Sequence, residues 1–291
     1  MNSSDDILAE LSVTDIAELA KIYEKHKIEL PHLQSFLQIC LKSRQMGMTD
    51  YVHVYSPVGC WKEDGTFIAS VPNHGHEIIL HSLDNTGKKL MEGLEKTQRF
   101  KFLIDPARIY TYFYAVHQDF FPKVYDFIAD VRQYKIYSAN KPNMWCLRKE
   151  KALMLDTTCP EGVYVKELEF KDIGTIVENW ELSFAEAGQK LANWLKLRRG
   201  FGVYLAEDDK LVSWISSSCF GQMAALQTLD EHKRKGYGSL VVRHMAKYLA
   251  EEGFDCCGTV NPENKASEAV LKKLGFEVLF QCQYIAVYNK Y

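Results

Sequence analysis

The stretch between residues 223 and 239 constrains the fold of this chain more than any other part of the sequence. An apolar, strand-like run at 223–229 leads through three basic residues to Gly236 and Gly238, where an amphipathic helix begins. The first N–H groups of a helix lack partners within the helix, and the helix dipole adds partial positive charge there. Glycine lets a ligand come close to the backbone because it has no Cβ. The stretch therefore predicts a strand-turn-helix unit that binds a polyanion, most simply a pyrophosphate.

Length and composition are those of an ordinary globular protein. The 291 residues are enough for two domains, and the net charge of −3 gives no overall basic bias toward nucleic acid. The polar start predicts no signal peptide, and no apolar run is long enough to span a membrane. The eight cysteines lack C-x-x-C spacing, so we interpret them as reduced, buried thiols. These features predict a cytosolic protein and leave a mitochondrial location open.

A second motif follows downstream and, with the first, carries a resemblance to a known family. Residues 261–267 contain Asn264 and Ser267, and the helix that follows ends in Leu-Gly-Phe at 274–276. The first motif resembles the Gln/Arg-x-x-Gly-x-Gly loop of the GNAT superfamily of acyl-CoA N-acyltransferases, with Lys233 in the Gln/Arg place. The second resembles the closing helix of that superfamily, and residues 211–223 are similar to its glycine N-acyltransferase-like branch. The resemblance covers about residues 161–291.

The pattern of elements predicts an α/β (α+β) fold. The first half reads as helices at 11–25 and 33–42, strands at 51–55, 66–71 and 77–82, a helix at 88–97, a strand at 100–104, a helix at 107–120, and strands at 125–128 and 133–137. The second half reads as a strand at 163–168, helices at 172–180 and 184–199, strands at 202–206, 211–219 and 222–228, a helix at 238–252, a strand at 256–260, a helix at 265–274 and a strand at 277–288.

We therefore predict two domains, at residues 1–150 and 161–291. The resemblance implies a mixed GNAT-type sheet with flanking helices in the second domain. The first domain repeats a similar order of elements without a glycine loop, so we interpret it as a degenerate GNAT-like copy that cannot bind phosphate. Residues 139–162 are interpreted as a linker in which 144–147 could form one more strand.

The resemblance implies a site for an acyl-CoA co-substrate. N–H groups of residues 234–239 would contact its pyrophosphate, and the strand before the loop would pair with the pantetheine arm. The implied contact residues are Leu226, Gln227, Thr228, Lys233, Arg234, Lys235, Gly236, Tyr237, Gly238, Ser239, Asn264 and Ser267. Other interpretations stay open for three of these features: the basic run as a solvated charge run, Tyr237 as packing, and Asn264 as a helix N-cap.

The candidate catalytic residues depart from the family pattern. Relatives place a glutamate base where this chain has Gln222, and a tyrosine acid where it has Leu271. An amide cannot accept a proton at neutral pH, although it can orient a water or the amine. Glu231 and His232 are chemical substitutes, but both lie at the loop. The histidines at 74, 76 and 81 have no recognisable ligand spacing, so we expect no metal.

These residues predict an acyl-CoA-dependent N-acyltransferase. An amine, glycine or another small amine by resemblance, would attack the thioester directly in a ternary complex. Two alternatives remain at this stage. The acceptor could be a peptide, a lysine or an arylalkylamine, or the chain could be a CoA-binding module with little catalytic activity, because neither proton-transfer group of the family is present.

Overall fold

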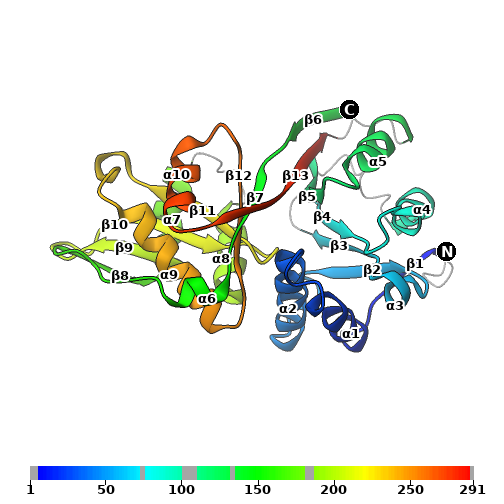
Figure 1. Ribbon diagram of the computed structural model, residues 1–291, viewed down its shortest axis with the longest axis horizontal. Coiled ribbons are helices and arrows are strands. Elements are labelled where there is room, and N and C mark those ends of the chain that lie inside the picture. The colour runs from blue at the N-terminus through cyan, green and yellow to red at the C-terminus, as the bar shows by residue number, and fades with distance from the viewer. Residues whose placement is uncertain (1–5, 73–75, 100–109, 132–134, 181–186, 289–291) are drawn as a thin grey trace. The chain divides into compact units, whose positions relative to one another are not determined.

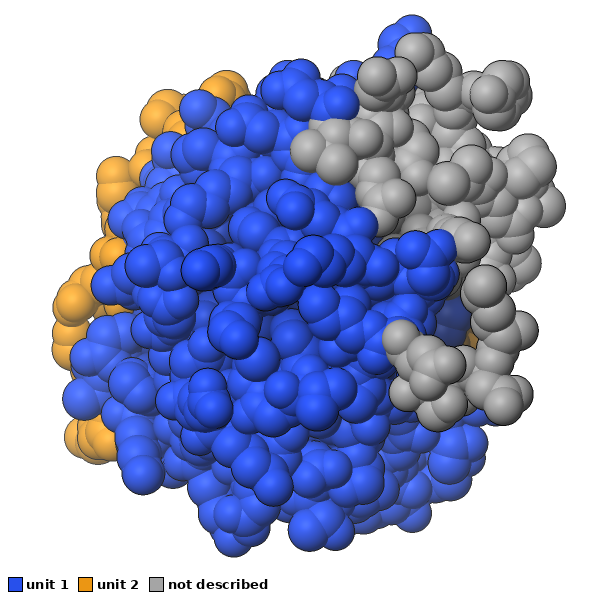
Figure 2. All heavy atoms as spheres, turned by 90° about the vertical axis from the view of Figure 1, so that its right-hand side faces the viewer, with its two compact units in different colours: residues 1–30, 40–143, 280–291 blue, residues 31–39, 144–279 orange. Residues whose placement is uncertain are grey.

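The computed structural model describes residues 6–72, 76–99, 110–131, 135–180 and 187–288. The chain forms two compact units that differ from two simple halves. Unit 1 comprises residues 1–30, 40–143 and 280–291, and unit 2 comprises residues 31–39 and 144–279 (Figure 2). Residues 31–39 thus belong to unit 2 although they lie in the first half of the chain, and residues 280–291 belong to unit 1 although they lie at its end. The division of the chain into domains at residues 1–150 and 161–291 remains a prediction.

Unit 1 contains one sheet with helices. Its elements are β1 (Leu8–Glu10), α1 (Val13–Glu24), β2 (His53–Pro57), α3 (Cys60–Asp64), β3 (Phe67–Pro72), β4 (His76–His81), α4 (Lys88–Lys96), β5 (Tyr110–His117), α5 (Phe121–Asp126), a π-helical turn (Phe127–Val131) and β6 (Lys135–Asn140). The strand order is β1-β2-β3-β4-β5-β13, and β6 also pairs with β13 (Glu277–Tyr288). Neighbours pair antiparallel except β4 and β5, which α4 connects as a parallel pair (Figure 1).

Unit 2 repeats this architecture. Its elements are β7 (Asn143–Leu147), α6 (Lys149–Leu153), β8 (Val163–Glu167), α7 (Ile173–Asn179), α8 (Ala187–Leu197), β9 (Phe201–Leu205), β10 (Leu211–Ser217), β11 (Met223–Thr228), α9 (Tyr237–Glu251), β12 (Cys256–Val260) and α10 (Lys265–Lys273). Helix α2 (Pro31–Gln45) contributes its first nine residues. The strand order is β8-β9-β10-β11-β12-β7, and α9 connects the parallel pair β11 and β12.

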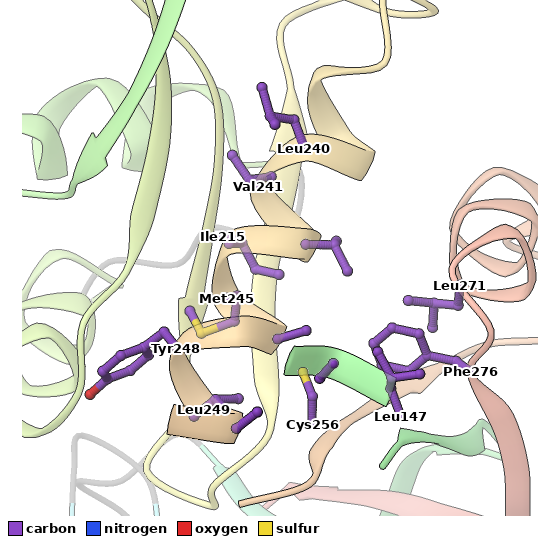
Figure 3. Packing of buried hydrophobic residues seen from close by; sticks show 14 of the residues in the cluster. Leu147, Ile215, Leu240, Val241, Met245, Tyr248, Leu249, Cys256, Leu271 and Phe276 are labelled. Carbon is purple, nitrogen blue, oxygen red and sulfur yellow. The ribbon is translucent and has the colours of Figure 1, made fainter. Parts of the chain in front are cut away.

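Helix α9 holds the core of unit 2 together. Its buried side chains Leu240, Val241, Met245 and Leu249 recur at helical spacing and face the sheet, where they contact residues such as Ile215 (Figure 3). Burying one such side chain contributes about 1.5–3 kcal/mol, so this stripe anchors the helix firmly. Because the core fixes α9 along its length, it also fixes the position of the helix N-terminus beside the end of β11.

The predicted α/β class with a mixed sheet is confirmed, and most predicted elements are present. The predicted helix at 107–120 is wrong over its described residues, because 110–117 form β5. Its tyrosine-rich sequence favours a strand, and β5 pairs with both β4 and β13. The predicted strand at 125–128 is also wrong, since α5 and the π-helical turn occupy these residues. The predicted strand at 100–104 lies outside the described residues. The expected linker contains β7 and α6.

Candidate functional site

Strand β11 lies inside its sheet and is nevertheless partly exposed along its whole length. It has β10 on one side and β12 on the other. All seven residues of β10 are buried, whereas all six residues of β11 are only partly buried. An interior strand with both neighbours in place would normally be covered, so this exposure marks an opening along β11.

A β-bulge and a short pairing explain the opening. The β10–β11 register runs from Trp214 opposite Gln227 to Ser216 opposite Ala224, so β11 carries one extra residue. Ala225 has a φ of 53°, which places it in the left-handed region. On the other side, β11 pairs with β12 at one position, Met223 opposite Gly258. Beyond that position the backbone groups of β11 on this side are therefore free for a ligand to pair with.

The bulge was missed by sequence reasoning. Glycine, asparagine and aspartate are the residues that usually adopt positive φ, and alanine gives no such signal. The segment of β11 beyond Met223 includes three of the predicted pantetheine contacts, Leu226, Gln227 and Thr228. The Gln227 carbonyl accepts a hydrogen bond from Ser213 Oγ on β10, so the alternation of the strand turns the backbone groups of Leu226 and Thr228 toward the open side. Pairing of this segment with a pantetheine arm remains a prediction.

The loop after β11 ends in an uncapped helix N-terminus. A 3₁₀ turn at Asp230–His232 leads to Gly236, the N-cap of α9, whose φ of 86° and missing side chain leave the helix end open. The first N–H to bond within the helix belongs to Leu240, which donates to the Gly236 carbonyl. Among the described residues, no group accepts a hydrogen bond from the N–H groups of residues 234–239. We refer to these N–H groups as the cradle, because they lie where the sequence predicts anion binding; anion binding there remains a prediction.

The side chains around this cradle are partly engaged with one another. Lys233 Nζ lies 2.6 Å from Asp230 Oδ1, and Lys235 Nζ lies 3.4 Å from His232 Nδ1. Arg234 has a φ of 63° and is exposed, and it forms no ion pair with any residue that the structure describes. Tyr237 stacks on His232 and packs against the core, in agreement with its interpretation as a packing residue.

Two glycines shape the cradle differently. A Cβ at Gly236 would meet nothing within 4 Å, so the space beside it is open. A Cβ at Gly238 would lie 3.4 Å from Thr228 Oγ1, which is ordinary contact. Neither glycine is therefore required by close packing, and only the positive φ of Gly236 demands glycine in the absence of a ligand.

Asn264 lies at the start of α10 and caps this helix, which was the alternative interpretation of this residue. Its side-chain oxygen accepts a hydrogen bond from the Ser267 N–H at 3.0 Å, so Asn264 is the N-cap of α10. The side chain is exposed, and its amide N–H groups are outside this bond. Contact of Asn264 and Ser267 with a ligand remains a prediction.

The two candidate catalytic residues lie at opposite ends of β11. Gln222 immediately precedes the strand, its side chain is 0% exposed, and neither its amide nitrogen nor its amide oxygen has a hydrogen-bond partner among the described residues. Glu231 follows the strand and is exposed, and it bonds Lys210 at 3.3 Å. Its own backbone N–H and Lys210 lower the pKa of the Glu231 carboxyl. The six residues of β11, which lie between them, span about 20 Å, so Gln222 and Glu231 cannot act on the same proton.

The position of the family's tyrosine is a core position in this chain. Leu271 on α10 is buried and belongs to the cluster that includes Phe276 and Leu240. A hydroxyl there would need its own partner inside an apolar cluster. The substitution is therefore consistent with packing, and no proton donor replaces the tyrosine at this position.

Unit 1 contains the same strand-turn-helix order, but its loop uses several of its own N–H donors. The loop after β4 leads to Gly87, the N-cap of α4, which has a φ of 58° like its counterpart Gly236. The sequence predicted no glycine loop in this unit, and the turn contains the single glycine Gly87. Here, however, the donors are used within the loop: Asp84 accepts from the N–H groups of Thr86 and Gly87, and Thr86 Oγ1 accepts from the Lys88 N–H.

The space beside Gly87 is also filled. A Cβ on Gly87 would lie 2.8 Å from the Phe120 ring, whereas Gly236 faces open space. Strand β4 pairs with β5 at three consecutive positions, and its residues Glu77–His81 are buried. Among the described residues of unit 1, the strand is therefore covered and the N–H groups of residues 86–88 are engaged, whereas the corresponding features of unit 2 are open. That unit 1 does not bind phosphate remains a prediction.

The described residues contain neither a metal-binding cluster nor a membrane-spanning helix. No three histidine, cysteine, aspartate or glutamate side chains among them are grouped closely enough to hold a metal ion. Within the same residues, no helix has both the length and the apolar character needed to cross a bilayer.

Comparisons with known proteins agree with this geometry. A family model described as FR47-like protein matches residues 200–285, which run from β9 into β13, and a domain of unknown function, DUF5645, matches residues 7–127. A solved Drosophila protein is similar over 98% of this chain and 99% of its own, with 20% identity and a TM-score of 0.85.

Two further solved structures are similar over nearly the whole chain. A tandem GNAT protein from the clavulanic acid biosynthesis pathway covers 98% of this chain and 98% of its own, with 11% identity and a TM-score of 0.56. A putative acetyltransferase from Pyrococcus horikoshii covers 100% and 92%, with 9% identity and a TM-score of 0.57. At these identities the likeness establishes the fold: this chain has the tandem GNAT fold.

Proposed function

We propose that this protein is an acyl-CoA-dependent N-acyltransferase whose site runs along β11 of unit 2. One observation carries the proposal: β11 is an interior strand with an open edge, and it ends at a helix N-terminus with free N–H donors. Together these features match an extended arm that ends in a pyrophosphate, which is the chemistry of an acyl-CoA. The FR47-like match and the tandem GNAT fold support the same class.

In this proposal the cradle and the strand hold the co-substrate. The N–H groups of residues 234–239 bind the pyrophosphate, with charge from Lys233, Arg234 and Lys235. The pantetheine arm pairs with the free edge of Leu226, Gln227 and Thr228. One N–H of this edge donates to the thioester carbonyl and stabilises the oxyanion that forms when the amine attacks. Asn264 and Ser267 are proposed as further contacts.

The protein supplies little help with proton transfer in this mechanism. The neutral amine attacks the thioester carbon, the nitrogen loses one proton to solvent water, and the C–S bond breaks as the tetrahedral intermediate collapses and the CoA thiolate leaves. A thiolate is a tolerable leaving group because a thiol has a pKa of about 8.5, so the loss of the tyrosine at Leu271 is not fatal. Gln222 cannot take the proton of the amine, and in this proposal its amide orients a water or the amine. Glu231 lies at the other end of β11, beside the proposed phosphate site, and takes no proton from the amine.

Glycine or another small amine is proposed as the acceptor, on the resemblance of residues 211–223 to the glycine N-acyltransferase-like branch. A peptide, lysine or arylalkylamine acceptor is the alternative within the same reaction. A second function is a CoA-binding module with little activity, which is favoured by the buried, unpartnered amide of Gln222.

The test is acyl transfer by the purified full chain. Acetyl-CoA and longer acyl-CoAs are incubated with glycine, small amines and a lysine peptide, and both thiol release and amide product are measured. Amide formation above the uncatalysed rate supports the enzyme. CoA binding without any amide product would support the module, and absence of CoA binding would contradict both.

A further inference from the structure

Arg198, the residue directly after α8, is a buried cation that forms no ion pair with a described carboxylate, although the charge of Glu252 partly offsets, from a distance, the lowering of its pKa by burial. Only 5% of it is exposed, and its guanidinium lies 4.5 Å from the ring of Phe254. Its Nη1 donates a hydrogen bond to Ser35 Oγ at 2.8 Å, and no carboxylate among the described residues forms an ion pair with it. The next residue, Arg199, shows the ordinary arrangement, since it is exposed and lies 2.8 Å from a carboxylate oxygen of Glu167.

Keeping such a charge inside a protein costs free energy. Burial lowers the pKa of Arg198 to about 10, so the side chain still carries its charge at neutral pH. A buried charge is normally paired or multiply hydrogen-bonded, and an apolar residue of similar size would usually be at least as stable in the same place. The position therefore suits an anion that arrives with a ligand.

Several other buried polar groups lie close by in the chain without partners. Ser216 Oγ, Ser217 Oγ and both amide atoms of Gln222 are buried, and no described residue bonds them. Ser216 is opposite Ala224, and Gln222 is two residues before Ala224, so Ser216 and Gln222 share one face of the sheet. This face presents hydrogen-bonding groups that the protein itself does not satisfy.

Ser35 connects the two features. Its Oγ accepts from Arg198 and lies 3.4 Å from the carbonyl oxygen of Gly221, which directly precedes Gln222. The approach is close, because a Cβ on Gly221 would lie 2.6 Å from Ser35 Oγ. The buried cation and the unpartnered amide are thus held at the same end of β11, by the same turn.

This end of β11 is the one away from the cradle. The strand runs from Met223 at the Gly221 turn to Thr228 at the start of the loop, a span of about 20 Å. If the pyrophosphate lies at α9 and the arm follows the free edge, the thioester points toward the Gly221 turn. The groups beyond the thioester, the acyl chain and the acceptor, then approach Arg198.

We propose that Arg198 binds a substrate carboxylate at the start of β11, with Ser35 orienting its guanidinium and with Ser216 and Gln222 supplying hydrogen bonds. The inference rests on the proposed function, because it takes the direction of the acyl-CoA from it. The carboxylate belongs either to the acceptor, as in an amino acid, or to the far end of a dicarboxylic acyl group. Arg198 is a specificity-determining residue in either case.

The experiment compares matched substrates with and without a carboxylate. Glycine is compared with methylamine, and succinyl-CoA with butyryl-CoA, in wild-type protein and in Arg198→Met, Arg198→Lys and Ser35→Ala. The loss of a hydrogen-bonded charge pair predicts that Arg198→Met lowers kcat/KM for the carboxylate-bearing partner by roughly 10- to 100-fold. The carboxylate-free partner should change less than about threefold. Comparing variants on the same substrate cancels the different basicities of the two amines.

Arg199→Met is the matched control, because it removes a neighbouring exposed arginine and should leave both preferences unchanged. Arg198→Lys should recover part of the preference, since it restores charge without the planar fork. A merely structural role would instead predict a less stable Arg198→Met protein and an equal loss with every substrate. Urea unfolding separates these outcomes, because we expect Arg198→Met to be as stable as wild type or more stable.

The same substrate pairs show whether the carboxylate belongs to the acceptor or to the acyl group. They also distinguish the Arg198 proposal from the proposal that the protein is an N-acyltransferase. A preference confined to glycine assigns it to the acceptor, and one confined to succinyl-CoA assigns it to the acyl group. If no pair is turned over, calorimetry with succinyl-CoA and butyryl-CoA, and with glycine added to the CoA complex, still measures the carboxylate. Carboxylate-dependent binding lost in Arg198→Met would then support the Arg198 site while contradicting the enzyme. Equal binding and turnover with and without the carboxylate would overturn the Arg198 proposal.

Discussion

Replacing Gly236 by alanine should separate the stability of the loop from its function. Gly236 has a φ of 86°, a conformation that costs an L-residue about 1–2 kcal/mol, and a new Cβ would meet nothing within 4 Å. We therefore expect Gly236→Ala to lose about that free energy of unfolding through backbone strain alone. Because the methyl group occupies the open side of the cradle, CoA affinity should also fall roughly tenfold or more, the equivalent of one charged hydrogen bond.

Gly253, at the other end of the same helix, provides a matched control. It follows α9, its φ is 91°, and an added Cβ would also meet nothing within 4 Å. Gly253→Ala should therefore lose a similar stability and leave CoA affinity unchanged. Urea unfolding gives the first quantity and calorimetry with CoA gives the second.

Gly238→Ala should change the free energy of unfolding in the opposite direction from Gly236→Ala. Alanine there has room beside Thr228 and favours the helix by about 0.5–1 kcal/mol, so the folded protein should be slightly more stable. Aspartate at the same position places a charge near the phosphates, and a repulsion of about 3 kcal/mol at 5 Å with an effective dielectric of 20 weakens CoA by roughly 100-fold. If Gly236→Ala and Gly238→Asp both bind CoA as well as wild type while Gly253→Ala shows the expected strain, the cradle is not the phosphate site.

Three further predictions concern other parts of the chain. Gln222→Glu should raise kcat/KM, by at most about 10²–10⁴-fold, and flatten its rise with pH, because wild-type rates should climb as the acceptor amine loses its proton; a wild-type plateau at pH 6.5 would contradict this. Gly221→Ala should lose more than about 2 kcal/mol of stability, because its Cβ would lie 2.6 Å from Ser35 Oγ at a φ of 73°, and urea unfolding measures this. Since burial lowers the pKa of Arg198 to about 10, any carboxylate preference should persist from pH 7 to 9 and fall as the pH rises through about 10; an unchanged preference at pH 11 would contradict it.

The features that the sequence predicted best are those with local causes. The bounds of β12 and β13 were predicted without error, because Cys256–Val260 and Glu277–Tyr288 are apolar runs bounded by turn residues. The cradle followed from Gly236 and Gly238, since a helix start and missing side chains are properties of a few adjacent residues. Asn264 likewise makes the N-cap contact that its spacing to Ser267 allows.

The features that the sequence could not give depend on distant partners. The tyrosine-rich sequence of β5 contains a local strand signal that the helix prediction missed, but its pairing with β4 and β13 could not be predicted, because β13 lies about 170 residues downstream. The bulge at Ala225 is imposed by pairing with β10. Arg198 and Arg199 read alike as solvated charges, and only their environments distinguish a buried cation from an exposed one.

The two units show how small the difference is between a strand-turn-helix that can bind an anion and one that cannot. Gly87 and Gly236 both begin a helix in the left-handed conformation after a strand of the parallel pair. In unit 1 the loop's own Asp84 accepts donors that an anion would need, the Thr86 N–H at its carboxylate and the Gly87 N–H at its backbone carbonyl, and Phe120 fills the space beside the glycine. Because a glycine at a helix start is thus compatible with a closed loop, it does not by itself define a phosphate site. What distinguishes unit 2 is that no described residue accepts from the N–H groups of residues 234–239, and these donors lie beside an open strand, where solvent or the proposed ligand can reach both.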